Sequence, residues 1–461
     1  MSKNLIIAEK WLMGNAFINS TIPDNVEYLC DTIGSRWSGT QKETSTINFI
    51  LKTFKRLKYT SIKKQGFNLK SWTINKSNVF IFDNSKIILD SKPCLFFPNL
   101  NIKTKIIDIN YGNSEYIIKN KKLLKNNVVL LKNEQEPFCE PESLAYKLKV
   151  LAETEVKCVL FYDNYFLGRF TKHFSSNDWV NSEPYNLEIP LIQTSREDGN
   201  YLSNKLKKNS CDININVKSE YFRKKSYNII ANLKGVFNTD DTIVLGAHHD
   251  TTFDSLGAND NASGLSVLLE TARLLKQLKS ETGISPGINI EFVTFGGEEQ
   301  ALQGSKYYVE EYIKRKKPLF MVNLDELSTG NMKGMILQFP ELYKLVSQEL
   351  NKMNEGFKCH ILSYIDTSGD MFSFTREGIP SSILWRWRFV GRRNESNYTH
   401  SPSDTFDKIN FRDLKEYAGF LSRILLRLSL IEPSKWPLNK MSAEKIMERA
   451  NAEKYIFKKT M

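Results

Sequence analysis

The sequence has little of what marks a membrane, secreted or disulfide-bonded protein. Its 461 residues contain no stretch near the ~18 apolar residues that a membrane span needs. The N-terminal apolar run, residues 5–8, is shorter than the ~7–15 residues in the core of a signal peptide. The six cysteines are far apart, which excludes the short Cys pairs of zinc ribbons and thioredoxin-like motifs. We expect a cytoplasmic protein with no membrane partner; export without a leader is the alternative.

Dense basic clusters are also missing, although the chain carries a net charge of +12. Its lysines are scattered among Asn and Ile, and the basic runs are short: residues 205–208, 223–225 and 314–317. A nucleic-acid site needs positive charge gathered on one face. The excess charge therefore indicates a solvated surface, and we expect no nucleic-acid partner.

Changes in the residue pattern divide the chain into four segments. Residues 1–77 favour a helix followed by a strand, and residues 78–217 favour short strands with one helix, around 142–153. Residues 218–432 alternate strands and helices, and the basic tail 433–461 favours a short helix, to which we assign no function. This pattern predicts a doubly wound, mostly parallel α/β sheet with helices on both faces and a small β-rich insert.

The alternating segment contains several buried strands that end at polar groups. Strands are predicted at 227–233, 242–247, 288–295, 319–324 and 379–385, and helices at 262–278, 304–314 and 411–430. Three of these strands run into His248, into Glu298 and Glu299, and into Asp325. In open α/β sheets, ligands bind beyond the carboxyl ends of the strands. The sequence therefore predicts one site built from several strands.

Five side chains at these strand ends and in two loops are candidate metal ligands: His248, Asp260, Glu299, Asp325 and His400. Each has a structural reading as well, since an Asp before a helix can be its N-cap and acidic groups are favoured in a first helical turn. Together, two imidazoles and three carboxylates suit zinc. One carboxylate can bridge two metals through its two oxygens, so the set predicts a site for two zinc ions.

Two further acidic residues complete the predicted site. Asp250 follows His248 by two positions, where it can accept the second N–H of a metal-bound imidazole, whereas His249 would point away and be structural. Glu298 and Glu299 are adjacent carboxylates, which repel each other unless a cation or a shared proton is present. We expect one of them to bind metal and the other to handle protons.

The order of these motifs resembles that of the di-zinc exopeptidases, peptidase family M28. The matching stretches are Gly-Ala-His-x-Asp at 246–250, Gly-Ala-x-Asp-Asn-Ala-Ser-Gly at 257–264, Gly-x-Glu-Glu at 296–299, Asn-Leu-Asp at 323–325 and His-x-Pro-x-Asp-Thr at 400–405. The resemblance covers residues 227–430 and the helix start at 33–36. It implies that His248 and Asp325 bind one zinc and that Glu299 and His400 bind the other. Asp260 would bridge the two ions, and Glu298 would be the general base and acid.

The insert resembles a protease-associated domain, through residues 128–131, 159–162 and Ile189-Pro190 before Asp198-Gly199. The resemblance implies that the insert covers or shapes the substrate entrance. The catalytic part shows one departure from the family pattern. Its stretch from Asp370 to Pro380 fits the order Asp-His-x-x-Phe followed by Gly-Ile-Pro, but Met371 replaces the usual His.

The resemblance implies a metal-dependent exopeptidase acting on peptides, with aminopeptidase as the activity common in the family. A carboxypeptidase or dipeptidase is the alternative, because guanidinium groups can clamp the C-terminal carboxylate of a substrate. Four arginines precede His400 and are candidates for that role, although they also suit a basic surface loop: Arg386, Arg388, Arg392 and Arg393. The insert argues against a glutaminyl cyclase. A non-catalytic protein like the transferrin receptor would have lost ligands that are all present here.

Overall fold

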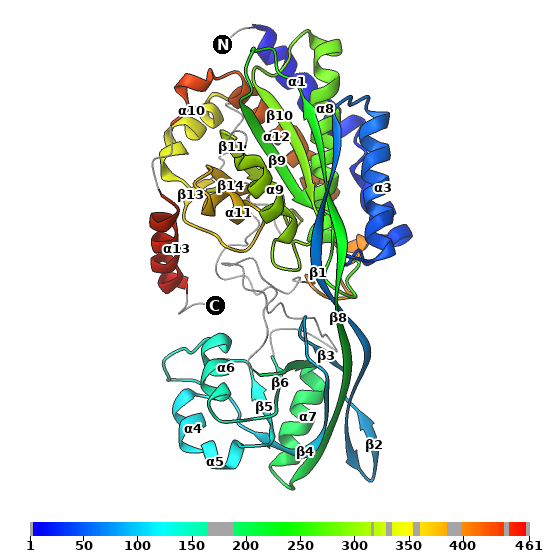
Figure 1. Ribbon diagram of the computed structural model, residues 1–461, viewed down its shortest axis with the longest axis vertical. Helices are drawn as coiled ribbons and strands as arrows, with labels where there is room; N and C mark the ends of the chain where they lie inside the picture. The colour runs from blue at the N-terminus through cyan, green and yellow to red at the C-terminus, as the bar shows by residue number, and fades with distance from the viewer. Residues whose placement is uncertain are drawn as a thin grey trace.

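Two lobes joined by a pair of long strands make up the computed structural model (Figure 1). The structure describes residues 3–163, 189–314, 318–328, 334–353, 360–384, 398–437 and 442–457. The long strands, β1 (Ile62–Asp83) and β8 (Cys211–Leu233), are antiparallel partners that run through both lobes. They join the strands of both lobes into one continuous sheet, which has 14 strands among the described residues.

The sheet of the upper lobe is mostly parallel, as the sequence predicts. Its centre contains β9 (Thr242–His248), β10 (Asn289–Phe295), β11 (Phe320–Asn323) and β14 (Ser381–Leu384). Strand β9 is parallel to β10 and β11, and β11 is parallel to β14. At the edge, β12 (Gly334–Leu337) is antiparallel to β14 and parallel to β13 (His360–Ser363). Every residue of β9, β11 and β14 is buried, as is typical of strands covered on both faces.

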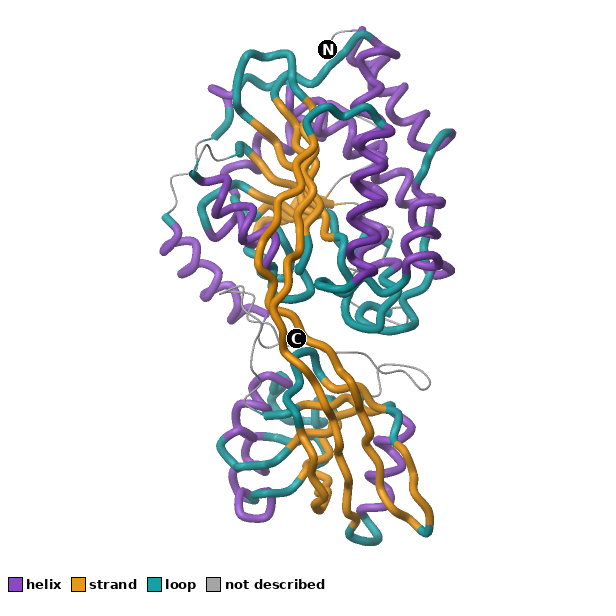
Figure 2. The backbone as a smooth tube through the Cα atoms, turned by 45° about the vertical axis from the view of Figure 1, so that its right-hand side comes forward, coloured by secondary structure: helices purple, strands orange, loops and turns teal. Residues whose placement is uncertain are grey.

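Helices cover both faces of this sheet (Figure 2). Successive strand residues point to opposite sides, so each face of β9 has its own core. Ile243 and Leu245 share one core with α1 (Lys3–Ile18), α3 (Gln41–Arg56), α8 (Gly264–Thr282) and α12 (Phe411–Ser429). Val244 packs on the other side with α9 (Gln303–Ile313) and α11 (Met371–Arg376). The predicted doubly wound α/β fold is confirmed.

Helix α1 is an element that the sequence pattern does not predict, because Glu9 and Lys10 interrupt its apolar run. In the structure Glu9 is buried and paired with two arginines of α12. Arg423 Nη2 lies 3.3 Å from Glu9 Oε2, and Arg427 Nε contacts Glu9 Oε1. Because a buried charge is tolerated when it is paired, α1 can pack against α12 despite this glutamate.

The lower lobe contains the predicted insert. Four of its strands lie side by side, each parallel to the next: β4 (Leu100–Asp108), β5 (Val128–Lys132), β6 (Cys158–Tyr162) and β7 (Leu191–Thr194). Strand β3 (Ser91–Pro93) pairs with β7, and β2 (Ser85–Ile88) pairs with β1. Four helices accompany them: α4 (Ser114–Lys119), α5 (Lys121–Leu124), α6 (Leu144–Ala152) and α7 (Arg196–Leu206). The insert thus has more helix than its β-rich pattern predicts. Its expected limits at 78 and 217 fall within β1 and β8, and its likeness to a protease-associated domain stays a prediction.

The described chain contains several further helical elements. They are α2 (Ile22–Glu27), α10 (Tyr343–Met353), α13 (Ala443–Phe457) and short helical segments at Tyr28–Ile33, Ala258–Ser263, Pro340–Leu342, Phe406–Lys408 and Pro433–Lys435. Helix α13 lies in the basic tail, where a short helix is predicted. Among the described residues, no helix combines the length and apolar character that spanning a bilayer requires.

Candidate active site

The predicted ligands lie at the carboxyl ends of the central strands, beside the junction of the two lobes. Strand β9 ends at His248, the segment after it carries Asp260, and the loops after β10 and β11 carry Glu299 and Asp325. The loop after β9 also contacts residues at the junction. Asp254 Oδ2 forms a 2.6 Å ion pair with Lys92 Nζ of β3, and the Phe253 ring packs edge-on against Trp72 of β1. The loop that follows His248 therefore contacts β1 and β3 at the junction.

His248 is the centre of a first group of ligands. Its Nε2 lies 3.1 Å from Asp260 Oδ1 and 3.3 Å from Asp325 Oδ1, and all three residues are buried. On the other side of the ring, Nδ1 lies 3.5 Å from Asp250 Oδ1. Because β9 ends at His248, Asp250 reaches the imidazole from a loop rather than from the pleat of a strand. His249 points away, as predicted, and its Nδ1 contacts Thr294 Oγ1 at 3.2 Å.

His400 is the centre of a second group. Its Nε2 lies 3.1 Å from Asp260 Oδ2 and 3.3 Å from Glu299 Oε2. Asp260 therefore presents one oxygen to each histidine. The fold brings all five predicted ligands to one place, although some are separated by about 150 positions in the sequence.

The two groups have the chemistry of a cation site. Each Nε2 faces two carboxylate oxygens, but one imidazole nitrogen carries at most one hydrogen. Buried carboxylates also require positive charge to offset their desolvation and mutual repulsion. Possible ligand atoms of His248, Asp260 and Glu299 lie within 4.8 Å of one another, as do those of His248, Glu298 and Asp325. These residues fit a bound metal ion, and Asp260 is placed where two ions could share it.

Burial and charge shift the pKa values of these groups when no metal is bound. Burial raises the pKa of the Glu298 carboxyl well above its usual range, and burial together with the Asp260 charge raises the pKa of Glu299 to about 8. Burial opposes protonation of His400, but Glu299 and Asp260 outweigh it and raise the pKa of this imidazole to about 10. The metal-free site therefore retains protons, which a metal must displace because its ligands bind in their deprotonated forms.

Glu298 and Glu299 occupy different positions although they are neighbours in the sequence. The Glu299 carboxylate faces His400, whereas a Glu298 carboxylate oxygen lies within 4.8 Å of possible ligand atoms of His248 and Asp325. The Glu298 N–H donates to Asp250 Oδ1 at 3.3 Å. This arrangement is compatible with different roles for the two glutamates, and the assignment of those roles stays a prediction.

Comparisons with known proteins find a family match over part of the chain. Residues 228–424 match peptidase family M28. This matched part, here the M28 domain, is less than half of the chain. The predicted family resemblance is confirmed over these residues.

The M28 domain has relatives among fungal and bacterial proteins. A probable leucine aminopeptidase 2 from Aspergillus oryzae is 24% identical over 403 residues, which cover 82% of this chain and 76% of that protein. Aminopeptidase YwaD from Bacillus subtilis is 29% identical over 282 residues, which cover 59% of this chain and 56% of that protein. The matched part is thus little more than half of the bacterial relative.

Solved structures share the fold over most of the chain. A peptidase M28 precursor from Shewanella amazonensis aligns over 94% of this chain and 99% of its own, with a TM-score of 0.74 at 18% identity. BSAP, a zinc aminopeptidase from Bacillus subtilis, aligns over 91% of this chain and 97% of its own, with a TM-score of 0.68 at 21% identity. At such identities the likeness concerns the fold, and its coverage includes both lobes.

Within the M28 domain, the segment that carries Asp260 is fixed through its backbone. Asp404 accepts the N–H groups of Asn259 at 2.8 Å and of Asp260 at 3.0 Å through its two oxygens. Gly257 has a φ of +59°, and a Cβ at this position would lie 2.3 Å from the Asp260 carbonyl oxygen, so the turn requires glycine. Helix α8 begins only at Gly264, so the alternative reading of Asp260 as the N-cap of this helix is wrong.

Arg36, which precedes the matched region, supports the same segment. Its fully buried guanidinium donates to the carbonyls of His249 at 3.2 Å, Leu256 at 2.8 Å and Gly257 at 2.9 Å. It also donates to two carbonyls of its own segment. The sequence indicates Arg36 only as part of the helix start at 33–36, because the pattern does not distinguish a buried arginine from a surface one. The sequence likewise indicates Asp404 only as one position of the motif at 400–405.

We expect Arg36→Met to lower the free energy of unfolding by at least about 3 kcal/mol. The substitution keeps an apolar stem but leaves several buried carbonyls without a donor, at ~1–3 kcal/mol each. Urea denaturation measures this change. Arg196→Met is the control, because Arg196 forms a partly exposed ion pair with Glu197 at 3.2 Å, a class of contact worth ~0–1 kcal/mol. Equal losses in the two variants would contradict the supporting role of Arg36.

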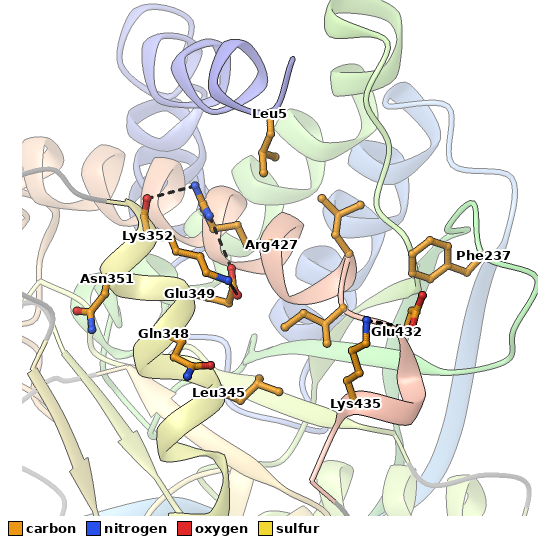
Figure 3. A pocket seen from close by; sticks show the side chains of 12 residues that line it. Leu5, Phe237, Leu345, Gln348, Glu349, Asn351, Lys352, Arg427, Glu432 and Lys435 are labelled. Carbon is orange, nitrogen blue, oxygen red and sulfur yellow. Dashed lines mark hydrogen bonds and ion pairs between the residues drawn. The ribbon is translucent and has the colours of Figure 1, made fainter. Parts of the chain in front are cut away.

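A cavity of about 970 Å³ lies away from these ligands (Figure 3). Its wall includes Phe237, before the start of β9, and Glu349 and Arg427, whose Oε2 and Nη1 are 3.6 Å apart. None of the predicted site residues that the structure describes lines it, so its size does not identify the active site. The four arginines expected to clamp a carboxylate, Arg386, Arg388, Arg392 and Arg393, lie outside the described residues.

Proposed function

We propose that this chain is a zinc-dependent aminopeptidase that removes N-terminal residues from peptides. The observation that carries the proposal is the position of Asp260, with one carboxylate oxygen 3.1 Å from each of two histidine nitrogens. Asp325 and Glu299 complete the two groups, and Glu298 lies beside them. The family match and the names of the relatives, which include aminopeptidases and a zinc aminopeptidase, support the same activity.

The ligands suit two zinc ions. His248 and Asp325 would hold one, Glu299 and His400 the other, and Asp260 would contribute one oxygen to each. Bound zinc supplies a water of lowered pKa, near ~7, and polarises the scissile carbonyl. Asp250, 3.5 Å from His248 Nδ1, would fix the tautomer and orientation of this imidazole.

The protein's own contribution to the reaction is proton transfer by Glu298. A general base must lie within reach of the proton that it removes, and Glu298 is buried beside both His248 and Asp325. In the proposed reaction Glu298 takes a proton from the attacking water. It then delivers this proton to the leaving amine, so that the carboxylate is restored at the end of each turnover.

A matched set of peptides tests this proposal. We expect the enzyme to release the N-terminal residue of a peptide with a free amine, and to cleave its N-acetylated form at least about 100-fold more slowly, because a site that binds an amine rejects the analogue lacking it. Amidation of the C-terminus should leave kcat/KM nearly unchanged. The reverse pattern would replace the aminopeptidase by a carboxypeptidase. Zinc binding without any peptide turnover would favour a non-catalytic binding protein.

A further inference from the structure

The loop that carries Glu298 and Glu299 is attached to an N-terminal turn that lies far away in the sequence. Ser38 Oγ accepts the N–H of Gly297 at 2.9 Å, immediately before Glu298. The Ser38 carbonyl accepts a hydrogen from Gln300 Nε2 at 3.1 Å, immediately after Glu299. One serine, with its side chain and its backbone fully buried, therefore contacts the loop on both sides of the two glutamates.

Glu43 in turn fixes Ser38. The Ser38 hydroxyl donates to Glu43 Oε1 at 2.9 Å, which leaves its lone pairs directed at Gly297. The Glu43 carboxylate also accepts from the Gly39 N–H at 2.7 Å and from the Ser226 hydroxyl of β8. A buried carboxylate with three donors from two separate parts of the chain is a rigid anchor.

Helix capping accounts for only part of this network. Thr40 Oγ1 accepts the Glu43 N–H at 3.3 Å and Glu43 accepts the Gly39 N–H, which together satisfy the start of α3. Capping does not require the contacts of Glu43 with Ser226, or those of Ser38 with Gly297 and Gln300. These additional contacts all lead towards the loop between β10 and α9.

The two glycines of the loop fit this attachment. A Cβ on Gly296 would lie 2.5 Å from Ser226 Oγ and 3.0 Å from Glu43 Oε1, so the loop backbone passes directly against the anchor. Gly297 has a φ of +68°, a conformation that favours glycine. The sequence Gly296-Gly297 before Glu298 therefore has a physical reason: the chain must pass close to Glu43 and then turn to present its N–H to Ser38.

We propose that Ser38 and Glu43 are positioning residues that hold Glu298 and Glu299 in their working orientation. Neither residue is a candidate ligand or proton carrier, and each acts through the backbone of the loop. The proposal rests on the proposed function for the roles of the two glutamates. Residues that orient metal ligands or catalytic groups from behind typically change affinity or activity by ~10–100-fold when they are removed.

Ser38→Ala and Thr40→Ala form a matched pair of tests. Ser38→Ala removes the acceptor for Gly297; we expect kcat to fall by ~10–100-fold with KM within about two-fold, and zinc affinity, measured by competition with a chelator, to weaken by ~10–100-fold. Thr40→Ala removes the helix cap and a 2.7 Å hydrogen bond to the Trp37 carbonyl, but no contact with the loop of Glu298 and Glu299. We expect a melting temperature lower by a few degrees with kcat and zinc affinity unchanged. Unchanged kcat and zinc affinity in Ser38→Ala would overturn the proposal. Equal losses in both variants would do the same.

Glu43→Gln is the second variant, in case Ser38→Ala does not fold. The amide keeps the shape of the side chain but offers one acceptor oxygen in place of two, so zinc affinity and kcat should fall together by about ten-fold. Values equal to the parent's would overturn the anchoring role. The zinc measurement separates this proposal from the proposed function. If the parent cleaves no peptide, the aminopeptidase assignment fails. Weaker zinc binding in Ser38→Ala and Glu43→Gln would still support the positioning of Glu299.

Discussion

Glu298→Gln is expected to lower kcat by ~10²–10⁴-fold while zinc stays bound, because the amide keeps the size and polarity of the side chain but cannot accept a proton at neutral pH. The effect should appear in kcat rather than in KM, since Glu298 would act on the attacking water and the leaving amine and not on the bound peptide. Steady-state kinetics on a free-amine peptide, together with metal analysis of the purified variant, measure both quantities.

The neighbouring variant Glu299→Gln is the control with the same chemical change. Glu299 Oε2 lies 3.3 Å from His400 Nε2, in the group proposed to hold a metal. We expect this variant to lose zinc and activity together, and to regain part of the activity in excess zinc. If Glu298→Gln loses zinc and Glu299→Gln keeps it, the two roles are reversed. Turnover near the parent's in Glu298→Gln would remove general-base catalysis by this residue.

The candidate site is predictable from the sequence because its signal is local. An apolar run marks each buried strand, and the residue at which the run stops marks the carboxyl end where ligands meet. His248, Glu299 and Asp325 follow this pattern at β9, β10 and β11. Asp260 and His400 lie in loops, and only the order of the motifs connects them with the strand ends. The structure brings all five together.

The supporting residues are not predictable in the same way, because their contacts join distant parts of the chain. Arg36 donates to the Leu256 and Gly257 carbonyls, and Ser38 accepts from Gly297. Each is one polar residue in an N-terminal turn, without a periodic pattern that would reveal burial. Glu43 is harder still to recognise, because its position near the start of α3 already explains it as a capping residue. The sequence alone therefore gives no reason to expect a further role for it.

Two features of the fold also escape the sequence pattern for physical reasons. The expected strand of the first segment lies within residues 1–77, whereas β1 continues to Asp83. In the continuation of β1, apolar and polar residues alternate less regularly because residues 75–77 are exposed between the lobes. Charged residues and Asn in such an exposed stretch give it the sequence pattern of a loop. Helix α1 is missed because Glu9, the residue that breaks its apolar run, is neutralised only by Arg423 and Arg427 of the distant α12.

Asp260→Asn is expected to abolish activity and to remove bound zinc, where the parent should hold about two ions per chain. Asp260 contacts both His248 and His400. The amide offers a single acceptor oxygen and no negative charge, so it can serve one group at most. We expect fewer than about one zinc per chain in this variant, measured by metal analysis after dialysis, with no detectable release of N-terminal residues.

Asp404→Asn tests whether this loss is specific to the ligand rather than to its segment. Asp404 holds the backbone of Asn259 and Asp260 through its two oxygens, and the amide retains one acceptor for these two N–H groups. We expect zinc affinity to weaken by ~10–100-fold, as for other residues behind metal ligands, and activity to return in excess zinc. Asp260→Asn should not recover in the same excess, because its segment is in place but its shared oxygen is absent. Two zinc ions retained by Asp260→Asn would contradict a shared carboxylate, and full recovery of its activity would move the bridging role to another residue.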